Sequence, residues 1–200
     1  MGNMSRKWVT AGAVLLSIAV IAGAFLLIRG GKIEVPSSFI EARGKGAEIS
    51  EFINDFSEKA KEGLQAIEEK DKSGDYVRAL DLTIIEVERL QQARVKSVEL
   101  LGELQKMTAS LGEIKSTNLQ SAGMQAVSNE VLLVERLIAY NEALKDLLDV
   151  LRAKYSSYEP QKFDASTNDL VKKINEDVSE INKLNRRYQT LIAEFDKKIK

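Results

Sequence analysis

Hydrophobic and polar residues alternate along most of the chain with the period of an α-helix, but one segment is apolar throughout. Residues 8–28, WVTAGAVLLSIAVIAGAFLLI, contain no charged side chain. At a rise of about 1.5 Å per residue, a helix of this length spans about 31 Å, close to the roughly 30 Å hydrocarbon core of a bilayer. Trp8 stands at one edge, and basic residues bracket both ends, as at membrane–water interfaces. The pattern predicts a single transmembrane helix over residues 8–28.

Cleavage by signal peptidase is the main alternative to a retained anchor. Ala22-Gly23-Ala24 has the small-residue pattern of a cleavage site, and a short basic tail, residues 1–7, precedes the apolar run. However, the triplet lies inside that run, which is longer than the apolar core of about 7–15 residues in an export signal. We therefore expect a retained signal-anchor in the cell membrane.

Basic residues on the two sides of the span favour opposite orientations of the anchor. A short basic tail before a first apolar segment is typical of a signal-anchor whose tail stays inside the cell. Basic residues that follow the span, including Arg43 and Lys45, favour the opposite orientation. We expect an extracytoplasmic body.

After a linker over residues 29–37, the remaining residues 38–200 are predicted to form one helical domain. The first helix is expected to begin near Ser38, with Glu41 completing a capping box. The run Arg43-Gly44-Lys45-Gly46 is expected to act as a flexible joint. Two further breaks are predicted, at Lys72–Gly74, with Asp75 capping the second helix, and at residues 112–116, with a capping box from Thr117 to Gln120. Pro160 marks the last break, because proline is unfavourable inside a helix.

The apolar positions of the first three helices predict which side chains face the core. In the first helix they are Ile49, Phe52, Ile53, Phe56, Ala60, Leu64 and Ile67; in the second, Tyr76, Leu80, Ile84, Val87, Leu90, Val98, Leu101, Leu104 and Leu111; in the third, Val127, Val131, Val134, Ile138, Leu144, Leu147, Leu148, Leu151 and Tyr155.

The fourth helix has the clearest pattern. One row recurs every seven residues at Ile174, Ile181, Tyr188 and Phe195, and a second row holds Val171, Val178, Asn185, Ile192 and Ile199. Two apolar rows per heptad are typical of a bundle or coiled coil. Short turns between long helices predict an all-α fold, an antiparallel up-down-up-down four-helix bundle with coiled-coil-like packing. The alternative is an extended coiled coil made by several chains.

Composition excludes several kinds of chemistry. The chain has no Cys and no His, which removes thiolate catalysis, disulfides and the commonest general base and metal ligand. Four of the 29 basic residues and none of the 30 acidic ones lie within residues 1–32, so residues 33–200 carry a net charge of −5. An acidic body without a basic cluster does not favour nucleic acid binding. No cofactor, metal or catalytic motif is recognised, and we expect that the protein is not an enzyme.

Four polar residues fall near the predicted inward rows: Gln91, Arg94, Asn141 and Asn185. Buried polar groups of this kind commonly fix the register between helices. Alternatively, they line a small polar pocket that binds a ligand. These four residues are the candidate site.

The segment Asn185-Arg186-Arg187-Tyr188, together with the plan of an anchor and a bundle, resembles LemA-type membrane proteins over these few residues, although that family's longer signature is missing from the first bundle helix. The plan also resembles the input modules of chemoreceptors, which normally continue into a second membrane span. We expect a scaffold, spacer or protein-interaction module at the membrane surface, bound to the bilayer through residues 8–28 and to a protein partner or a second copy. The alternative is a sensor that binds a ligand between its helices.

Overall fold

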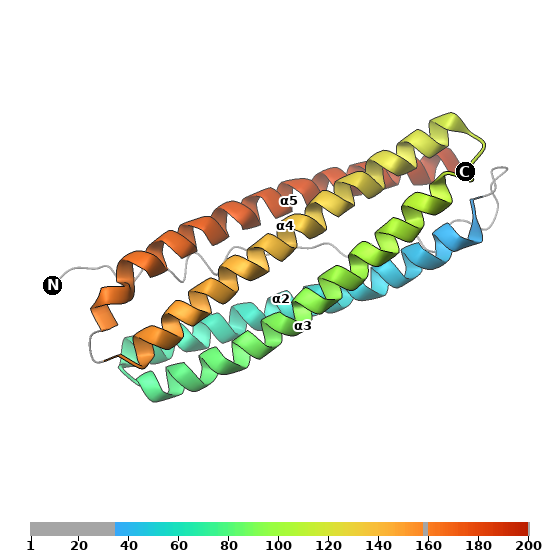
Figure 1. Ribbon diagram of the computed structural model, residues 1–200. Coiled ribbons are helices and arrows are strands. Elements are labelled where there is room, and N and C mark those ends of the chain that lie inside the picture. The colour runs from blue at the N-terminus through green and yellow to red at the C-terminus, as the bar shows by residue number, and fades with distance from the viewer. Residues whose placement is uncertain (1–34, 158–159, 200) are drawn as a thin grey trace. The chain divides into compact units, whose positions relative to one another are not determined.

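The computed structural model describes residues 35–157 and 160–199 (Figure 1). The predicted basic tail, the transmembrane helix over residues 8–28 and most of the linker lie outside the described residues. The described chain is all-α and contains no strand. Its elements are α2 (Ser37–Ser73), α3 (Tyr76–Leu111), α4 (Thr117–Tyr155), the short 3-10 helix η2 (Pro160–Phe163) and α5 (Asp164–Ile199). Within this part, no helix is both apolar and long enough for a membrane span.

The helices contribute to two compact units. Among the described residues, unit 1 consists of residues 55–94, 138–157 and 160–179, and unit 2 of residues 35–54, 95–137 and 180–199. Each unit therefore takes one segment from each of the four long helices.

In unit 2, the end of one helix lies beside the start of another in two helix pairs, α3 with α2 and α5 with α4. The Ser110 hydroxyl near the end of α3 donates a hydrogen bond of 2.8 Å to the Ser38 hydroxyl near the start of α2. Lys198 near the end of α5 donates a hydrogen bond of 2.8 Å to Asn118 near the start of α4. The segments in each of these two pairs therefore run antiparallel, as expected when short turns join consecutive helices.

Unit 1 has its own apolar core, drawn from all four helices. The buried members are Ile67, Ala79, Leu90, Ala143, Leu144, Leu147, Leu148, Leu151, Tyr155, Val171 and Ile174. The rings of Tyr76 and Tyr155 stack at its edge with centroids 5.9 Å apart. Lys154 and Asp71 form a largely buried ion pair of 3.2 Å between α4 and α2.

The turn between α2 and α3 forms where the sequence predicts it. Gly74 has a φ of 74°, a conformation that glycine adopts without a Cβ clash. The Asp75 amide donates to the carbonyl of Lys70 at 3.0 Å, which closes the end of α2 in a Schellman-type cap. The Asp75 carboxylate accepts a hydrogen bond from the Arg78 amide, so its predicted role as the N-cap of α3 is confirmed.

Three local predictions need correction. The joint predicted at Arg43–Gly46 is continuous helix inside α2, and Arg43 is buried there because Asp196 pairs with it. α4 is capped by Ser116, one residue before the predicted Thr117, because the Leu119 amide bonds to the Ser116 hydroxyl. α2 begins at Ser37, and the amides of Phe39 and Ile40 donate to the Pro36 carbonyl. The capping box predicted between Ser38 and Glu41 does not form, because Glu41 pairs with Lys45.

The inward face of α3 matches the prediction only in part: Leu90, Leu104 and Leu111 are buried as predicted. Its buried residues follow one another at spacings of three and four: Ala79, Thr83, Glu86, Leu90, Ala93, Ser97, Leu100 and Leu104. Tyr76, Ile84 and Val98, predicted to point inward, are exposed. α3 has apolar residues on two adjacent faces, so periodicity alone does not choose between them. Small side chains such as Ala93 and Ser97 allow the closer approach to neighbouring helices.

The heptad rows of α5 are largely confirmed. Ile174, Ile181, Tyr188 and Phe195 are all buried, as is Asn185, the polar member of the second row. On α2, Phe52 is the exception among the predicted core residues. It is 40% exposed, and the Lys96 ammonium group lies 5.8 Å from the centre of its ring.

Candidate functional site

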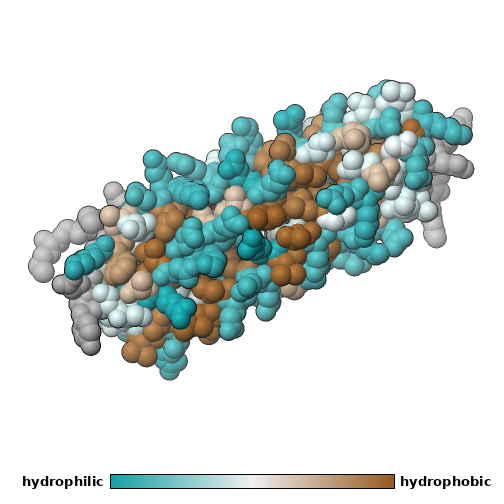
Figure 2. All heavy atoms as spheres, in the orientation of Figure 1, coloured by the Kyte–Doolittle hydropathy of each residue, from teal (hydrophilic) through white to brown (hydrophobic). Residues whose placement is uncertain are grey.

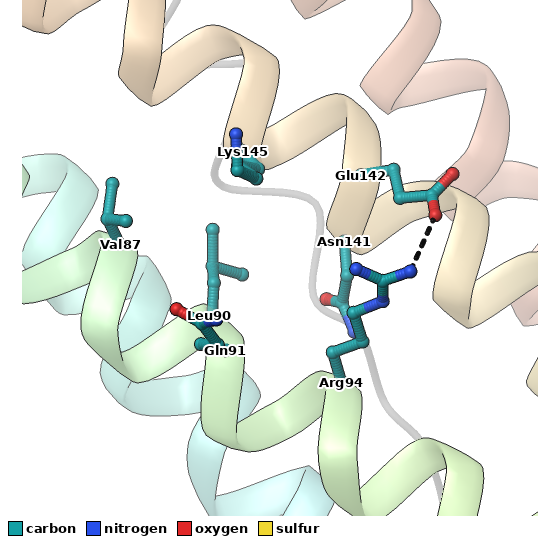
Figure 3. A pocket seen from close by; sticks show the side chains of 7 residues that line it. All are labelled: Val87, Leu90, Gln91, Arg94, Asn141, Glu142 and Lys145. Carbon is teal, nitrogen blue, oxygen red and sulfur yellow. Dashed lines mark hydrogen bonds and ion pairs between the residues drawn. The ribbon is translucent and has the colours of Figure 1, made fainter.

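Three of the four candidate residues line one pocket in unit 1, between α3 and α4 (Figure 3). Gln91 and Arg94 come from α3 and Asn141 from α4. Val87 and Leu90 supply apolar contacts, and Glu142 and Lys145 complete the lining. Two neighbouring helices thus bring together polar side chains that are about 50 residues apart in the sequence. Within α3, the helical repeat of about 3.6 residues places Gln91 and Arg94 on the same side of the helix.

Asn141 is the buried polar member of this pocket. Its side chain is only 6% exposed, and its Nδ2 atom has no hydrogen-bond partner among the described residues. Arg94 and Glu142 form an ion pair of 3.4 Å across the rim, with both side chains more than half exposed. Such an exposed pair contributes at most about 1 kcal/mol. Gln91 also lies at the surface, so only Asn141 is enclosed by the core.

The pocket is small. Its volume is about 70 Å³, whereas sites for small organic ligands usually measure about 300–1,000 Å³. There is room for a few water molecules or for one small polar group. The fourth candidate, Asn185, belongs to unit 2, where it is buried on α5, and it does not line this pocket.

Unit 2 contains a second, more deeply buried polar cluster. The Arg43 guanidinium on α2 donates two hydrogen bonds, of 2.7 and 2.9 Å, to the two oxygens of Asp196 on α5. The side chains are 5% and 18% exposed. A two-point contact of this kind is both strong and geometrically specific, so it fixes α2 against α5.

Glu130 on α4 belongs to the same cluster and is 2% exposed. The Tyr188 hydroxyl on α5 lies beside its carboxylate, yet neither group makes a hydrogen bond of ordinary geometry within the described chain. Burial raises the pKa of Glu130 to about 7, although Tyr188 and the positive charge of Arg43 favour the ionised form. Glu130 therefore exchanges its proton near neutral pH.

Unit 1 has a buried carboxylate of its own at Glu86 on α3. Burial raises its pKa to about 7, while the ion pair with Arg89 opposes that shift. The Glu86 carboxylate occupies the space beside Gly63 on α2 where any larger residue would place its Cβ. Gly63 thus allows α3 to seat a carboxylate against the backbone of α2.

The sequence contains a signal for the buried cluster that the apolar pattern alone passes over. Glu130 lies four residues after Ala126 and four before Val134, in step with the buried row of α4. Arg43 follows Phe39 by four residues in the same way on α2. Charged residues at core positions of a heptad pattern are the signal, because they are rarely buried without a partner.

Comparison with known proteins finds no match to any family model, any curated protein or any solved structure. The resemblance to LemA-type proteins therefore rests on a few residues of α5. Within residues 35–157 and 160–199, no cluster of three or more acidic residues is arranged to hold a metal ion.

Proposed function

We propose that this chain is a non-enzymatic, single-pass membrane protein whose helical body acts as a scaffold, spacer or protein-interaction module at the membrane surface. Residues 8–28 are the proposed anchor, and the two units together are the proposed up-down-up-down bundle. The body is proposed to lie outside the cytoplasm. Anchoring confines the body to a surface and so raises its effective concentration toward any partner in the same membrane.

The observation that carries this proposal is the exposure of large apolar side chains on α3. Those in unit 1 are Tyr76, Val77, Ile84 and Ile85; those in unit 2 are Val95 and Val98, with Phe52 of α2 also exposed. Figure 2 shows hydrophobic side chains reaching the surface among hydrophilic ones. Because the buried row of α3 includes Thr83, Glu86 and Ser97, the helix leaves apolar side chains outside while it buries polar ones.

Covering these side chains would stabilise a complex. Apolar surface removed from water contributes about 25 cal/mol per Å², and fully burying a valine or isoleucine contributes roughly 1.5–3 kcal/mol. Val95 and Val98 are each 55% exposed, so each has about half of that energy left for a partner. Two or three such contacts together contribute a few kcal/mol toward binding.

Photo-crosslinking in cells tests the interaction. A photoreactive residue placed at Val98 should give a discrete crosslinked product, because the partner covers that side chain. The same residue at Glu135, an exposed polar position on α4, is the matched control. Equal products at both positions, or none at Val98, would contradict a specific surface on α3.

Orientation has a separate test. A reporter that is active only outside the cytoplasm, fused after Lys200, should be active. Silence of that reporter, with activity of a cytoplasmic reporter at the same place, would reverse the proposed topology.

The second candidate function is a sensor that binds a ligand in the pocket between α3 and α4. The observation in its favour is Asn141, whose buried amide nitrogen has no partner among the described residues. The volume of about 70 Å³ weighs against it, because an organic ligand needs several times more space. We therefore place the interaction module first.

A further inference from the structure

The cluster in unit 2 contains one cation, Arg43, and two carboxylates, those of Glu130 and Asp196, together with Tyr188. Arg43 makes a two-point contact with Asp196, while its charge also acts on Glu130. Asp196 lies nearer the surface, with a side chain 18% exposed. Glu130 is enclosed, and both of its oxygens lack a hydrogen-bond partner within the described chain.

The protonation state of Glu130 decides which carboxylate needs the cation. A neutral carboxyl group tolerates an apolar site, but an ionised one without a partner costs several kcal/mol. If Glu130 loses its proton, the cluster carries two negative charges and one positive charge in a buried place. Asp196 can be rehydrated at the surface, whereas Glu130 cannot, so the least costly arrangement gives the guanidinium to Glu130.

We propose that unit 2 contains a proton-binding switch in which Arg43 pairs with Asp196 while Glu130 is protonated, and pairs with Glu130 when that proton leaves. The step transfers one proton from the Glu130 carboxyl group to water. No covalent bond other than the O–H bond changes. The switch goes beyond the proposed interaction function and does not depend on it.

The groups around Glu130 are accounted for helix by helix. α2 contributes Arg43 and α5 contributes Tyr188, while Asp196 of α5 acts on both Arg43 and Tyr188. In the described part of the chain, α3 supplies no charge that acts on Glu130, and its buried Glu103 is paired with Lys106. Arg43 is thus the one cation in the described surroundings that can follow the charge of Glu130.

The exchange of partners has a structural consequence within unit 2. While Arg43 binds Asp196, it joins α2 to the last turns of α5; when it binds Glu130, it joins α2 to α4 instead. The end of α5 then loses a buried two-point contact and opens more often to solvent. A rise in pH through the neutral range should therefore loosen the end of α5 selectively.

NMR titration of the full chain tests the switch. The side-chain carboxyl carbon of Glu130 and the guanidinium signals of Arg43 should change together, with a shared midpoint near neutral pH. Amide hydrogen exchange across residues 190–199, corrected for its intrinsic pH dependence, should rise severalfold above that midpoint. Glu130→Gln, which imitates the protonated form, should make the Arg43 signals and the exchange of α5 independent of pH.

A second variant keeps the test decisive if Glu130→Gln folds poorly. Asp196→Asn removes the competing carboxylate, so the Glu130 midpoint should fall by about 1 pH unit. Glu135→Gln, at an exposed position on the same helix, should change nothing. Titration of Glu130 near its ordinary pKa of 4.5 would overturn the proposal. So would Arg43 signals that stay constant through the Glu130 transition, or an Asp196→Asn variant with an unchanged midpoint.

Discussion

Replacing Glu130 with glutamine should stabilise the protein in a way that depends on pH. The unfolded chain ionises Glu130 near its ordinary pKa of 4.5, while burial raises the pKa of the folded state to about 7. Between these values the folded state keeps a proton that the unfolded state has lost, so stability falls as pH rises. Below about pH 4.5 the penalty is absent, and above about pH 7 it is complete. Glutamine cannot ionise and avoids the penalty.

The size of the effect follows from the shift in pKa. A shift of one unit corresponds to about 1.4 kcal/mol, so a shift from 4.5 to about 7 corresponds to roughly 3 kcal/mol. The Glu130→Gln variant should therefore match the parent protein near pH 4.5 and exceed its free energy of unfolding by roughly 3 kcal/mol at pH 8. Urea unfolding followed by circular dichroism at several pH values measures this difference. The pH dependence due to Glu86 is common to both proteins and cancels.

Two results would refute this reasoning. A difference in the free energy of unfolding that stays constant from pH 4.5 to pH 8 would show that Glu130 titrates alike in the folded and unfolded states. A variant less stable than the parent at pH 8 would show that ionising Glu130 does not destabilise the folded protein, contrary to its raised pKa.

Three further predictions concern packing and architecture. Gly123→Ala should lower the free energy of unfolding by roughly 1–2 kcal/mol, because the added methyl would lie 2.5 Å from a Leu111 methyl and 2.9 Å from the Phe195 ring. Its matched control, Gly102→Ala on α3, meets nothing within 4 Å and should raise stability by up to about 1 kcal/mol; equal effects in chemical denaturation would contradict this packing. Asn141→Leu should raise stability by about 1 kcal/mol by removing a buried amide nitrogen without a partner in the described chain, and a loss of stability would show that the amide is needed for packing. A chain without residues 1–32 should be strongly helical by circular dichroism, and a mostly unfolded spectrum would contradict a bundle that folds without the anchor segment.

Helix positions were predictable from sequence because local chemistry determines them. The Asp75 cap and Gly74 turn depend on backbone hydrogen bonds within a few residues, and the heptad rows of α5 depend on a period set by helix geometry. The predicted capping residue of α4, Thr117, is wrong by one position, because Ser116 and Thr117 are both good N-cap residues and the sequence does not choose between them.

Part of the inward face of α3 was not predictable in the same way, although Leu90, Leu104 and Leu111 are buried as predicted. Ile84 and Val98 are strongly apolar but exposed, while Thr83 and Glu86 are buried, because the fit with neighbouring helices decides the register. The buried cluster in unit 2 was not predictable for the same reason. Arg43 and Asp196 are 153 residues apart, and nothing local in the sequence indicates that they meet.

Three of the four candidate residues lie together in the pocket, and the fourth lies elsewhere. Gln91, Arg94 and Asn141 do line one pocket, since helical spacing places them on facing sides of α3 and α4. Asn185 lies in unit 2 and is buried there. The sequence did not indicate this, because a heptad position alone does not tell which neighbouring helix a residue contacts. Whether these residues bind a ligand stays a prediction.

The most direct test of the proposed function is the crosslinking yield at Val98 with and without the anchor segment. An anchored interaction module should give a discrete product at Val98 in the membrane fraction. Deleting residues 8–28 should sharply reduce the yield of that product, because the effective concentration of the partner falls. An unchanged yield after the deletion, or a protein that never enters the membrane fraction, would contradict the proposal.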